Sequence, residues 1–420
     1  MAELLRQLGF ECRVVTWLPR LSGNGVESIY SETAEKVDSE RATSLAEHAG
    51  FPDPAMAADY DRDWYFASTS EKRRHALRII SAAGEIIKNW GPNALVSAVG
   101  GETLRVVFDA LARSFGVLTL YFNAIPLAGR FVLLPSMSAA FVPREGEFGY
   151  KPSRWLPDDL GDLKSCDGPA FVNHLQESRF DGVARLFQTK LMDAGVYPRH
   201  WWERKSWNRA KAMALSSIAV RESARRPNDV NVLYPMHDER DFQVAVRERH
   251  AVPQVHLLRY VASTLPPGYR LWVKPHPHHL EAHHQLLLRE IRYTPNIGFL
   301  DPATGFSEAI ADCDVVFTLA STLGFEALRR GKPVVCYGTP FYSGCGVTED
   351  VRDPRQISAA IVRAVGMPPH PREVERLIYR MEEYSWEGQF TPISLEVENL
   401  RRMSLGILDV LRAEQIWIVQ

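Results

Sequence analysis

A lysine and a histidine share one short proline-rich turn, Lys274-Pro275-His276-Pro277. The turn follows an apolar run at 269–273 that has the pattern of a buried strand, which puts both side chains at a strand's carboxyl end. Ligands of open α/β sheets bind at that edge. An ammonium and an imidazole there could bind a phosphate on a turn stiffened by prolines. An ordinary loop with an incidental histidine is the alternative.

A second strand end carries hydroxyl and carboxylate side chains. Ser321 and Thr322 follow the apolar run 315–319 and open a helical pattern. Their hydroxyls, together with the N–H groups and positive dipole end of the helix, could cradle an anion. Glu326 lies one turn further and could accept a hydrogen bond from a ribose hydroxyl. The alternative is a simple cap and a solvated carboxylate, but two such strand ends in adjacent units favour a binding site.

Two more strand ends carry candidates for acid or base chemistry. His237 follows the run 230–234 and could contact a phosphate or a transferred group, or simply cap a turn. Glu102 follows Gly100-Gly101 between a strand pattern and a helix pattern. A carboxylate there can take a proton from a hydroxyl as a general base. It could equally be an acidic residue that stabilises the first turn of a helix.

Five histidines fall between positions 276 and 284, which raises the question of a metal site. His279 and His283 have the i, i+4 spacing of a zinc-binding helix, but they lack the glutamate of an HExxH motif and an obvious third ligand. A solvated helix face explains them better. We therefore expect no metal and no other cofactor.

Apolar strand-like runs alternate with helical patterns, which is typical of βαβ units and an α/β fold. In the first half, strands are predicted at 12–18, 94–99 and 117–122, with helices at 71–89 and 103–115. In the second half, strands are predicted at 230–234, 269–273, 298–300, 315–319 and 333–337, with helices at 254–264, 279–291, 306–312, 323–330 and 356–365. A helical pattern at 1–9 comes first, so the strand usual at the start of such a domain either precedes Met1, with the start assigned too far downstream, or is missing from the first sheet.

The chain has 420 residues, enough for two domains with separate cores. We expect a first domain at 1–226 with a helical insertion at about 145–215. A second domain is predicted at 227–366, after the turn signal Arg226-Pro227-Asn228. Two amphipathic helices are expected at 367–420.

The charge balance excludes one class of function. With 49 basic and 51 acidic side chains the net charge is −2, whereas proteins that coat nucleic acid need an excess of basic residues. Five widely spaced cysteines form neither a disulfide framework nor a metal knuckle, which favours a reducing cytoplasm. Residues 1–10 lack the pattern of a secretory signal, and the apolar region 115–142 is too interrupted for a good membrane span.

The second half resembles the capsule polysaccharide biosynthesis family, whose members include Kdo transferases. The resemblance rests on four elements in the family's order over about 130 residues, with an aromatic pair after the last. They are Pro235-Met236-His237, Lys274-Pro275-His276-Pro277, Ser321-Thr322-Leu323-Gly324-Phe325-Glu326-Ala327, and Gly331-Lys332-Pro333-Val334 with Phe341-Tyr342. Two departures are Arg240-Asp241, where the family usually has Pro-Glu, and Ala320, where it has glycine.

The resemblance implies a GT-B architecture, with two Rossmann-like domains whose parallel sheets face each other across a cleft, and C-terminal helices that pack back. It implies a cytoplasmic glycosyltransferase, with possible peripheral contact to the inner face of the membrane or to a capsule-assembly complex. The partners would be a nucleotide sugar, with a CMP-sugar favoured, and a glycan or lipid-linked acceptor.

The same resemblance suggests a role for each candidate residue. Lys274 and His276 would bind the donor phosphate, Ser321 and Thr322 would cradle it, and Glu326 would hold the ribose or base. Catalytic contributions are expected from Glu102, His237 and His276. Two alternatives stay open: a glycerophosphotransferase that uses CDP-glycerol, and a non-catalytic relative that binds a nucleotide or glycan during capsule assembly.

Overall fold

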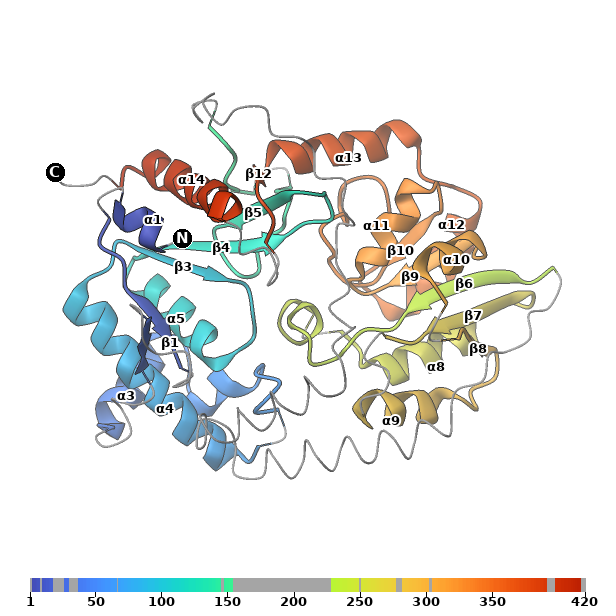
Figure 1. Cartoon of the computed structure of the whole chain (residues 1–420). Coiled ribbons are helices and arrows are strands. Elements are labelled where there is room, and N and C mark those ends of the chain that lie inside the picture. Colours follow the sequence, from blue (N-terminus) through green and yellow to red (C-terminus); the bar gives the residue numbers. More distant parts are fainter. Residues whose placement is uncertain are drawn as a thin grey trace, which may run out of the picture. The chain divides into compact units, whose positions relative to one another are not determined.

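The computed structural model divides the chain into two compact units, the first formed by Met1–Arg199 with Arg380–Gln420 and the second by His200–Tyr379 (Figure 1). It describes residues 2–7, 10–17, 26–29, 37–65, 67–144, 147–153, 228–248, 251–276, 282–301, 304–390 and 397–416. Nearly all of the predicted helical insertion at 145–215 lies outside these residues. No helix among them is long and apolar enough to cross a membrane.

The second unit is built on a six-stranded sheet in which every neighbouring pair of strands is parallel. In sequence order the strands are β6 (Val230–Pro235), β7 (Tyr269–Lys274), β8 (Ile297–Phe299), β9 (Val315–Thr318), β10 (Val334–Cys336) and β11 (Glu349–Asp350). In space they lie in the order β11-β10-β9-β6-β7-β8. Counted from β6, this is the 3-2-1-4-5-6 order of a Rossmann fold, which reverses direction between β6 and β9.

Helices connect these strands and cover the sheet. They are α8 (Gln254–Thr264), α9 (Ala282–Ile291), α10 (Phe306–Ala311), α11 (Thr322–Arg329) and α12 (Ile357–Val365), with a short π-helix η4 (Gln243–Arg247) and a 3₁₀ turn η5 (Pro354–Gln356). Helix α8 ends where Pro266 and Pro267 follow Leu265, because proline cannot continue a helix.

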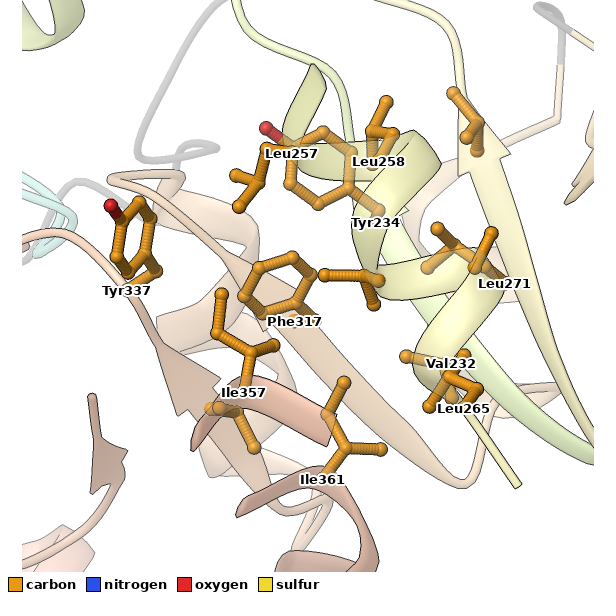
Figure 2. Close-up of a cluster of buried hydrophobic side chains, with 14 of the residues drawn as sticks. Val232, Tyr234, Leu257, Leu258, Leu265, Leu271, Phe317, Tyr337, Ile357 and Ile361 are labelled. Atoms are coloured by element: carbon orange, nitrogen blue, oxygen red, sulfur yellow. The ribbon is translucent and has the colours of Figure 1, made fainter. Parts of the chain in front are cut away.

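The core of the second unit lies between the sheet and helices α8 and α12 (Figure 2). Tyr234 and Phe317 come from β6 and β9, and their rings lie 5.4 Å apart between centroids. Leu258 from α8 and Ile361 from α12 are fully or almost fully buried in the same cluster. Strands buried on both faces explain why the apolar runs of this half are continuous rather than alternating.

The first unit contains a four-stranded sheet and a separate pair of parallel strands. The larger sheet has the order β12-β5-β4-β3, from β3 (Ala94–Ala98), β4 (Leu118–Ala124), β5 (Arg130–Leu134) and β12 (Trp386–Glu387). The pair is β1 (Val14–Thr16) and β2 (Val26–Ser28). The helical segments are α1 (Ala2–Gln7), α3 (Ser39–His48), η2 (Pro54–Ala58), α4 (Thr69–Glu85), η3 (Ile86–Trp90), α5 (Thr103–Ser114) and α14 (Val397–Ala413). Helix α13 (Pro371–Glu383) begins in the second unit and ends in the first, because the division falls between Tyr379 and Arg380.

The end of the chain completes the first unit. Strand β12 adds to β5, with Trp386 opposite Phe131, and their rings lie 6.2 Å apart. Trp386 is buried, and its Nε1 donates a 3.0 Å hydrogen bond to Asp409 in α14. Arg130 donates to the hydroxyl and carbonyl oxygens of Ser385. The C-terminal helix therefore packs back onto the first unit, as predicted.

The α/β class and its two Rossmann-like halves are confirmed, with one departure in the first unit. There β3 and β4 are parallel, but β4–β5 and β5–β12 are antiparallel. Strands β4 and β5 are separated by residues 125–129 only, and so short a connection can join antiparallel neighbours but not parallel ones. The sequence prediction ended the strand region at 122 and missed β5.

Candidate functional site

His237 lies at the point where the strand order of the second unit reverses. It follows β6, and its Nε2 lies 3.3 Å from Thr318 Oγ1 at the end of β9 and 3.4 Å from the backbone N of Ala320. Its backbone N–H donates to Gln254 Oε1, and its backbone carbonyl accepts from Gln254 Nε2. The histidine thereby connects the ends of β6 and β9 with the start of α8.

The hydrogen bonds and burial of His237 keep its imidazole neutral. Burial, with a smaller contribution from the charge of His276, lowers the pKa of His237 to about 3. Nε2 accepts from the Ala320 N–H, so the ring proton of the neutral form lies on Nδ1. An imidazole in this state orients the β9–α11 turn. Its predicted part in catalysis stays a prediction.

Ser321 and Thr322 form the start of α11 but differ in what they offer a ligand. Ser321 is the N-cap: its Oγ accepts from the N–H of Leu323 at 3.2 Å, and its own N–H donates to Thr318 Oγ1. Thr322 is the first helical residue and is exposed. Its N–H precedes the first intrahelical bonds, so this group has no acceptor within the helix.

The glycine and the tyrosine of the family pattern meet at the same helix end. The buried hydroxyl of Tyr342 donates a 2.5 Å hydrogen bond to the carbonyl of Ser321. A β-carbon on Gly324 would lie 2.1 Å from that hydroxyl oxygen, which is closer than atoms can approach. Glycine at 324 therefore makes room for the tyrosine that holds the first turn of α11.

Lys274 lies at the carboxyl end of β7, where the sequence predicted it. The residue is only 4% exposed, and burial lowers the pKa of its ammonium while the charge of Asp301 raises it. No residue in the described part of the chain accepts a hydrogen bond from Nζ or forms an ion pair with it. The ammonium instead lies 5.2 Å from the ring centroid of Phe306.

The three strand ends are close neighbours at one edge of the sheet. β7 pairs with β6, and β6 pairs with β9, so the ends of β7 and β9 are about 10 Å apart. His276 is half-buried and close enough to His237 for its charge to lower the pKa of that residue. The sequence prediction thus assigned Lys274, His276, His237 and Ser321 to the correct edge.

Glu326 lies in the second turn of α11. Its carboxylate is 3.5 Å from Nη1 of Arg329 and 3.5 Å from Nη1 of Arg330 on the same helix. Surface pairs of this kind contribute little to stability. The carboxylate is thus accessible and partly neutralised, and its predicted contact with a ribose or base stays a prediction.

Lys332 has a structural role in the fourth family element. Its ammonium donates to the backbone carbonyl of Ala311, the last residue of α10, at 3.2 Å and to that of Cys313, two residues further, at 2.7 Å. Gly331 has φ +71°, a left-handed conformation that glycine adopts without strain and that ends α11. This element positions helices and is not at the strand ends that carry the site.

In the first unit, Glu102 is the N-cap residue of α5, but its side chain does not cap the helix. The carboxylate forms a 3.0 Å ion pair with Arg105, whose guanidinium also donates to the carbonyl of Val99. Both side chains are more than a third exposed. The part that Glu102 would take as a general base stays a prediction.

Asp61 caps α5 instead, a role that the sequence analysis missed. Its Oδ2 accepts from the N–H and the hydroxyl of Thr103, at 2.9 and 2.8 Å. Burial is the main cause that raises the pKa of Asp61 to about 6, against the effect of these hydrogen bonds. The residue lies in a polar stretch, Asp61-Arg62-Asp63, that looks like an ordinary loop, so no local signal distinguishes it.

Among the described residues, no group of three or more histidine, cysteine, aspartate or glutamate side chains is placed to hold a metal ion. His279 and His283 are the pair with the spacing of a zinc-binding helix. The position of His279 and the side chain of His283 lie outside the described part of the chain.

Comparison with known proteins identifies the segment that carries the site. Residues 187–360 match the family described as "Capsule polysaccharide biosynthesis protein". The family resemblance is confirmed. The matched segment contains Lys274, His276, His237, Ser321 and Glu326, whereas Glu102 lies outside it.

Two curated proteins are similar to this chain over shorter stretches. The "Capsule polysaccharide modification protein LipA" of Neisseria meningitidis serogroup A is 32% identical over 136 residues, which is 29% of this chain and 17% of that protein. The "Lipopolysaccharide-processing protein LpsZ" of Rhizobium meliloti is 36% identical over 84 residues, or 20% of this chain and 19% of that protein. The chain thus matches less than a fifth of the length of either relative.

Among solved structures, the β-Kdo 2,7 transferase of KpsC from Thermosulfurimonas dismutans aligns with 79% of this chain and 89% of its own, at 17% identity and a TM-score of 0.40. The calicheamicin glycosyltransferase CalG4 aligns with 98% of this chain and 93% of its own, at 12% identity and a TM-score of 0.32.

Proposed function

We propose that the protein is a glycosyltransferase of surface or capsular polysaccharide synthesis. It transfers a sugar from a nucleotide-activated donor, with a CMP-sugar favoured, to a glycan or lipid-linked acceptor. The family match supports the polysaccharide pathway, and the geometry of the second unit supports the nucleotide donor. The partners in this proposal are the nucleotide sugar and the acceptor, and the proposal includes no metal ion.

The observation that carries the proposal is Lys274, whose side chain is 4% exposed but whose ammonium nitrogen is not fully enclosed, so that a ligand can reach it. A cation in a largely buried side chain is stabilised by an anion, and the described residues supply none in direct contact. Lys274 lies at the carboxyl edge of a Rossmann-type sheet, beside the reversal of strand order where such folds bind nucleotides. A donor phosphate would be the missing anion.

The same phosphate would lie near the start of α11. The N–H and hydroxyl of Thr322 and the positive end of the helix add to the charge of Lys274. When the sugar leaves, negative charge grows on the departing phosphate, and donors fixed in advance stabilise it. His276 is half-buried and lies two residues beyond Lys274, which favours it over the buried His237 as the second phosphate ligand.

Nucleotide binding tests the donor site directly. CMP, CDP, UDP and GDP are titrated into the wild-type protein and into Lys274→Met by calorimetry. Loss of a hydrogen bond between charged groups should weaken the preferred nucleotide by about tenfold or more. Arg289→Met is the matched control, because Arg289 is an exposed cation in the last turn of α9, at the opposite edge of the sheet. Equal affinity in all three proteins would refute the assignment.

Turnover separates the proposed reaction from its alternatives. The protein is incubated with acceptor lipid and a panel of nucleotide sugars or CDP-glycerol, and the mass of the product is measured. A mass gain of one sugar supports the proposal, and a gain of one glycerol phosphate identifies a glycerophosphotransferase. Nucleotide binding without any product would identify a non-catalytic relative.

A further inference from the structure

Phe306 is a large aromatic side chain at the edge of the sheet that holds Lys274. It is the first residue of α10, and 46% of its surface is exposed. Its ring centroid is 5.2 Å from the ammonium of Lys274. Exposing an aromatic ring to water is unfavourable. Here the exposed ring lies beside the Lys274 ammonium, to which it is attracted and for which the proposed function supplies a phosphate.

We infer that Phe306 is the aromatic platform on which the base of the nucleotide stacks. The inference rests on the proposed donor site, because it places the phosphate of the same nucleotide on Lys274. The ammonium would then be shared between the phosphate and the negative face of the ring. Stacking on an aromatic side chain binds any base through its π-face and is independent of the sugar that the donor carries.

Polar side chains continue from Phe306 towards α11. Ser307 follows it in the chain, and Ser307 Oγ lies 3.4 Å from Nη2 of Arg330. The other terminal nitrogen of Arg330 lies 3.5 Å from the carboxylate of Glu326. An aromatic face, a hydroxyl, a guanidinium and a carboxylate thus follow one another along α10 and α11. These are the groups that suit a base and the hydroxyls of its ribose.

The position of α10 is fixed by contacts that do not involve Phe306. Ala309 and Ile310 are buried on the inner side of the helix, and Lys332 binds the carbonyls at its end. Substitution of Phe306 should therefore alter the surface of α10 and leave its backbone in place.

The test compares a nucleotide with the same phosphate sugar that lacks a base. Calorimetry measures the affinity of CMP and of ribose 5-phosphate for wild type, Phe306→Ala and Phe306→Trp. Phe306→Ala should weaken CMP by about tenfold, the effect of losing one stacked aromatic, and leave ribose 5-phosphate unchanged. Phe306→Trp should retain CMP binding. Tyr293→Ala is the control, since Tyr293 is a 78% exposed aromatic that precedes β8, at the other edge of the sheet.

Each outcome refers to one of the two proposals. If CMP and ribose 5-phosphate both weaken equally in Phe306→Ala, the ring contributes to phosphate or sugar binding and the platform is refuted. If Phe306→Ala binds CMP like wild type while Lys274→Met does not, the platform is refuted and the donor site stands. If wild type binds none of CMP, CDP, UDP and GDP, the proposed function itself fails.

Discussion

Single buried side chains decide the chemistry of the second unit. Lys274 is a largely buried cation with no ion-pair partner among the described residues, whereas the imidazole of His237 is neutral and bonded to the β9–α11 turn. Both residues follow neighbouring strands, and lysine and histidine are both residue types that often bind phosphate. Their different contacts distinguish them, because the ring of His237 is already hydrogen-bonded within the protein, whereas the ammonium of Lys274 has no hydrogen bond to any residue that the structure describes.

The pH dependence of stability should reveal the neutral state of His237. Its pKa is lowered from 6.5 to about 3 by burial, so between these values the unfolded chain binds a proton that the folded chain excludes. The stability is present above pH 6.5 and is lost as the pH falls. From pH 7 to pH 5 the free energy of unfolding should decrease by about 2 kcal/mol through this residue. Denaturant unfolding of the protein at pH 7 and pH 5, followed for the second unit, measures this difference in the free energy of unfolding.

His237→Gln keeps a polar side chain and removes the titration, so its stability should change less between pH 7 and pH 5. His256→Gln serves as the control, because His256 is exposed on α8 of the same unit. A wild-type pH dependence that persists unchanged in His237→Gln would contradict the neutral, buried imidazole.

At the level of residues, the sequence predicted positions better than partners. The alternation of strands and helices assigned Lys274 and Ser321 to strand ends, because local pattern determines where a strand stops. It did not predict that Asp61 rather than Glu102 caps α5, since the two segments are 42 positions apart and meet only in the folded unit. It also did not predict that Lys274 is buried without an ion pair to any residue that the structure describes.

Helix α11 is the element on which the proposed anion site depends. Its start is held by Tyr342 and by the hydrogen bonds of His237 and Thr318 to the turn that precedes it. The glycine of the motif is explained by this packing and not by a need for flexibility. The sequence motif therefore records a contact between two segments that lie 18 residues apart.

Two substitutions should loosen this helix end to different degrees. Tyr342→Phe removes one buried hydrogen bond, which typically costs about 1 kcal/mol. Gly324→Ala places a methyl group against the tyrosine hydroxyl and should cost more, about 1–3 kcal/mol, because a backbone or ring must shift. Hydrogen exchange at the first amides of α11 should rise in both variants, and more in Gly324→Ala.

Tyr337→Phe is the control for these variants, because Tyr337 is also buried in the second unit but its hydroxyl has no hydrogen-bond partner among the described residues. If Tyr342→Phe exchanges at the same rate as Tyr337→Phe, the hydrogen bond to Ser321 does not hold α11. Nucleotide affinity measured on the same three proteins shows whether a looser helix start also weakens the ligand.

The whole molecule consists of two units that the chain visits in turn before it returns to the first. Each unit has its own buried clusters, and residues 380–420 complete the first one. Periodicity predicted both α/β halves and the C-terminal helices. It could not predict β12, because a strand of two residues carries no period, and only its pairing with β5 makes it a strand.

Matched tryptophan substitutions should destabilise the units separately. Trp386 is buried in the first unit and Trp272 in the second, so replacing either by alanine should cost about 3–5 kcal/mol in its own unit. Trp386→Ala should leave nucleotide affinity unchanged, and a saturating nucleotide should raise the unfolding temperature of the unit that binds it. Calorimetric unfolding of both variants with and without nucleotide provides the measurement. If both variants instead show a single unfolding transition that is shifted by the same amount, the two units unfold together.

The two anchored ends of α11 have a consequence for redesign of the protein. Tyr342 fixes the start of the helix, and Gly331 with Lys332 fixes the segment that leaves it. These contacts oppose movement of the helix along its axis. If the proposed donor site is correct, a library confined to Thr322 and Glu326, which lie on α11 between these contacts, should change ligand preference on an unchanged backbone.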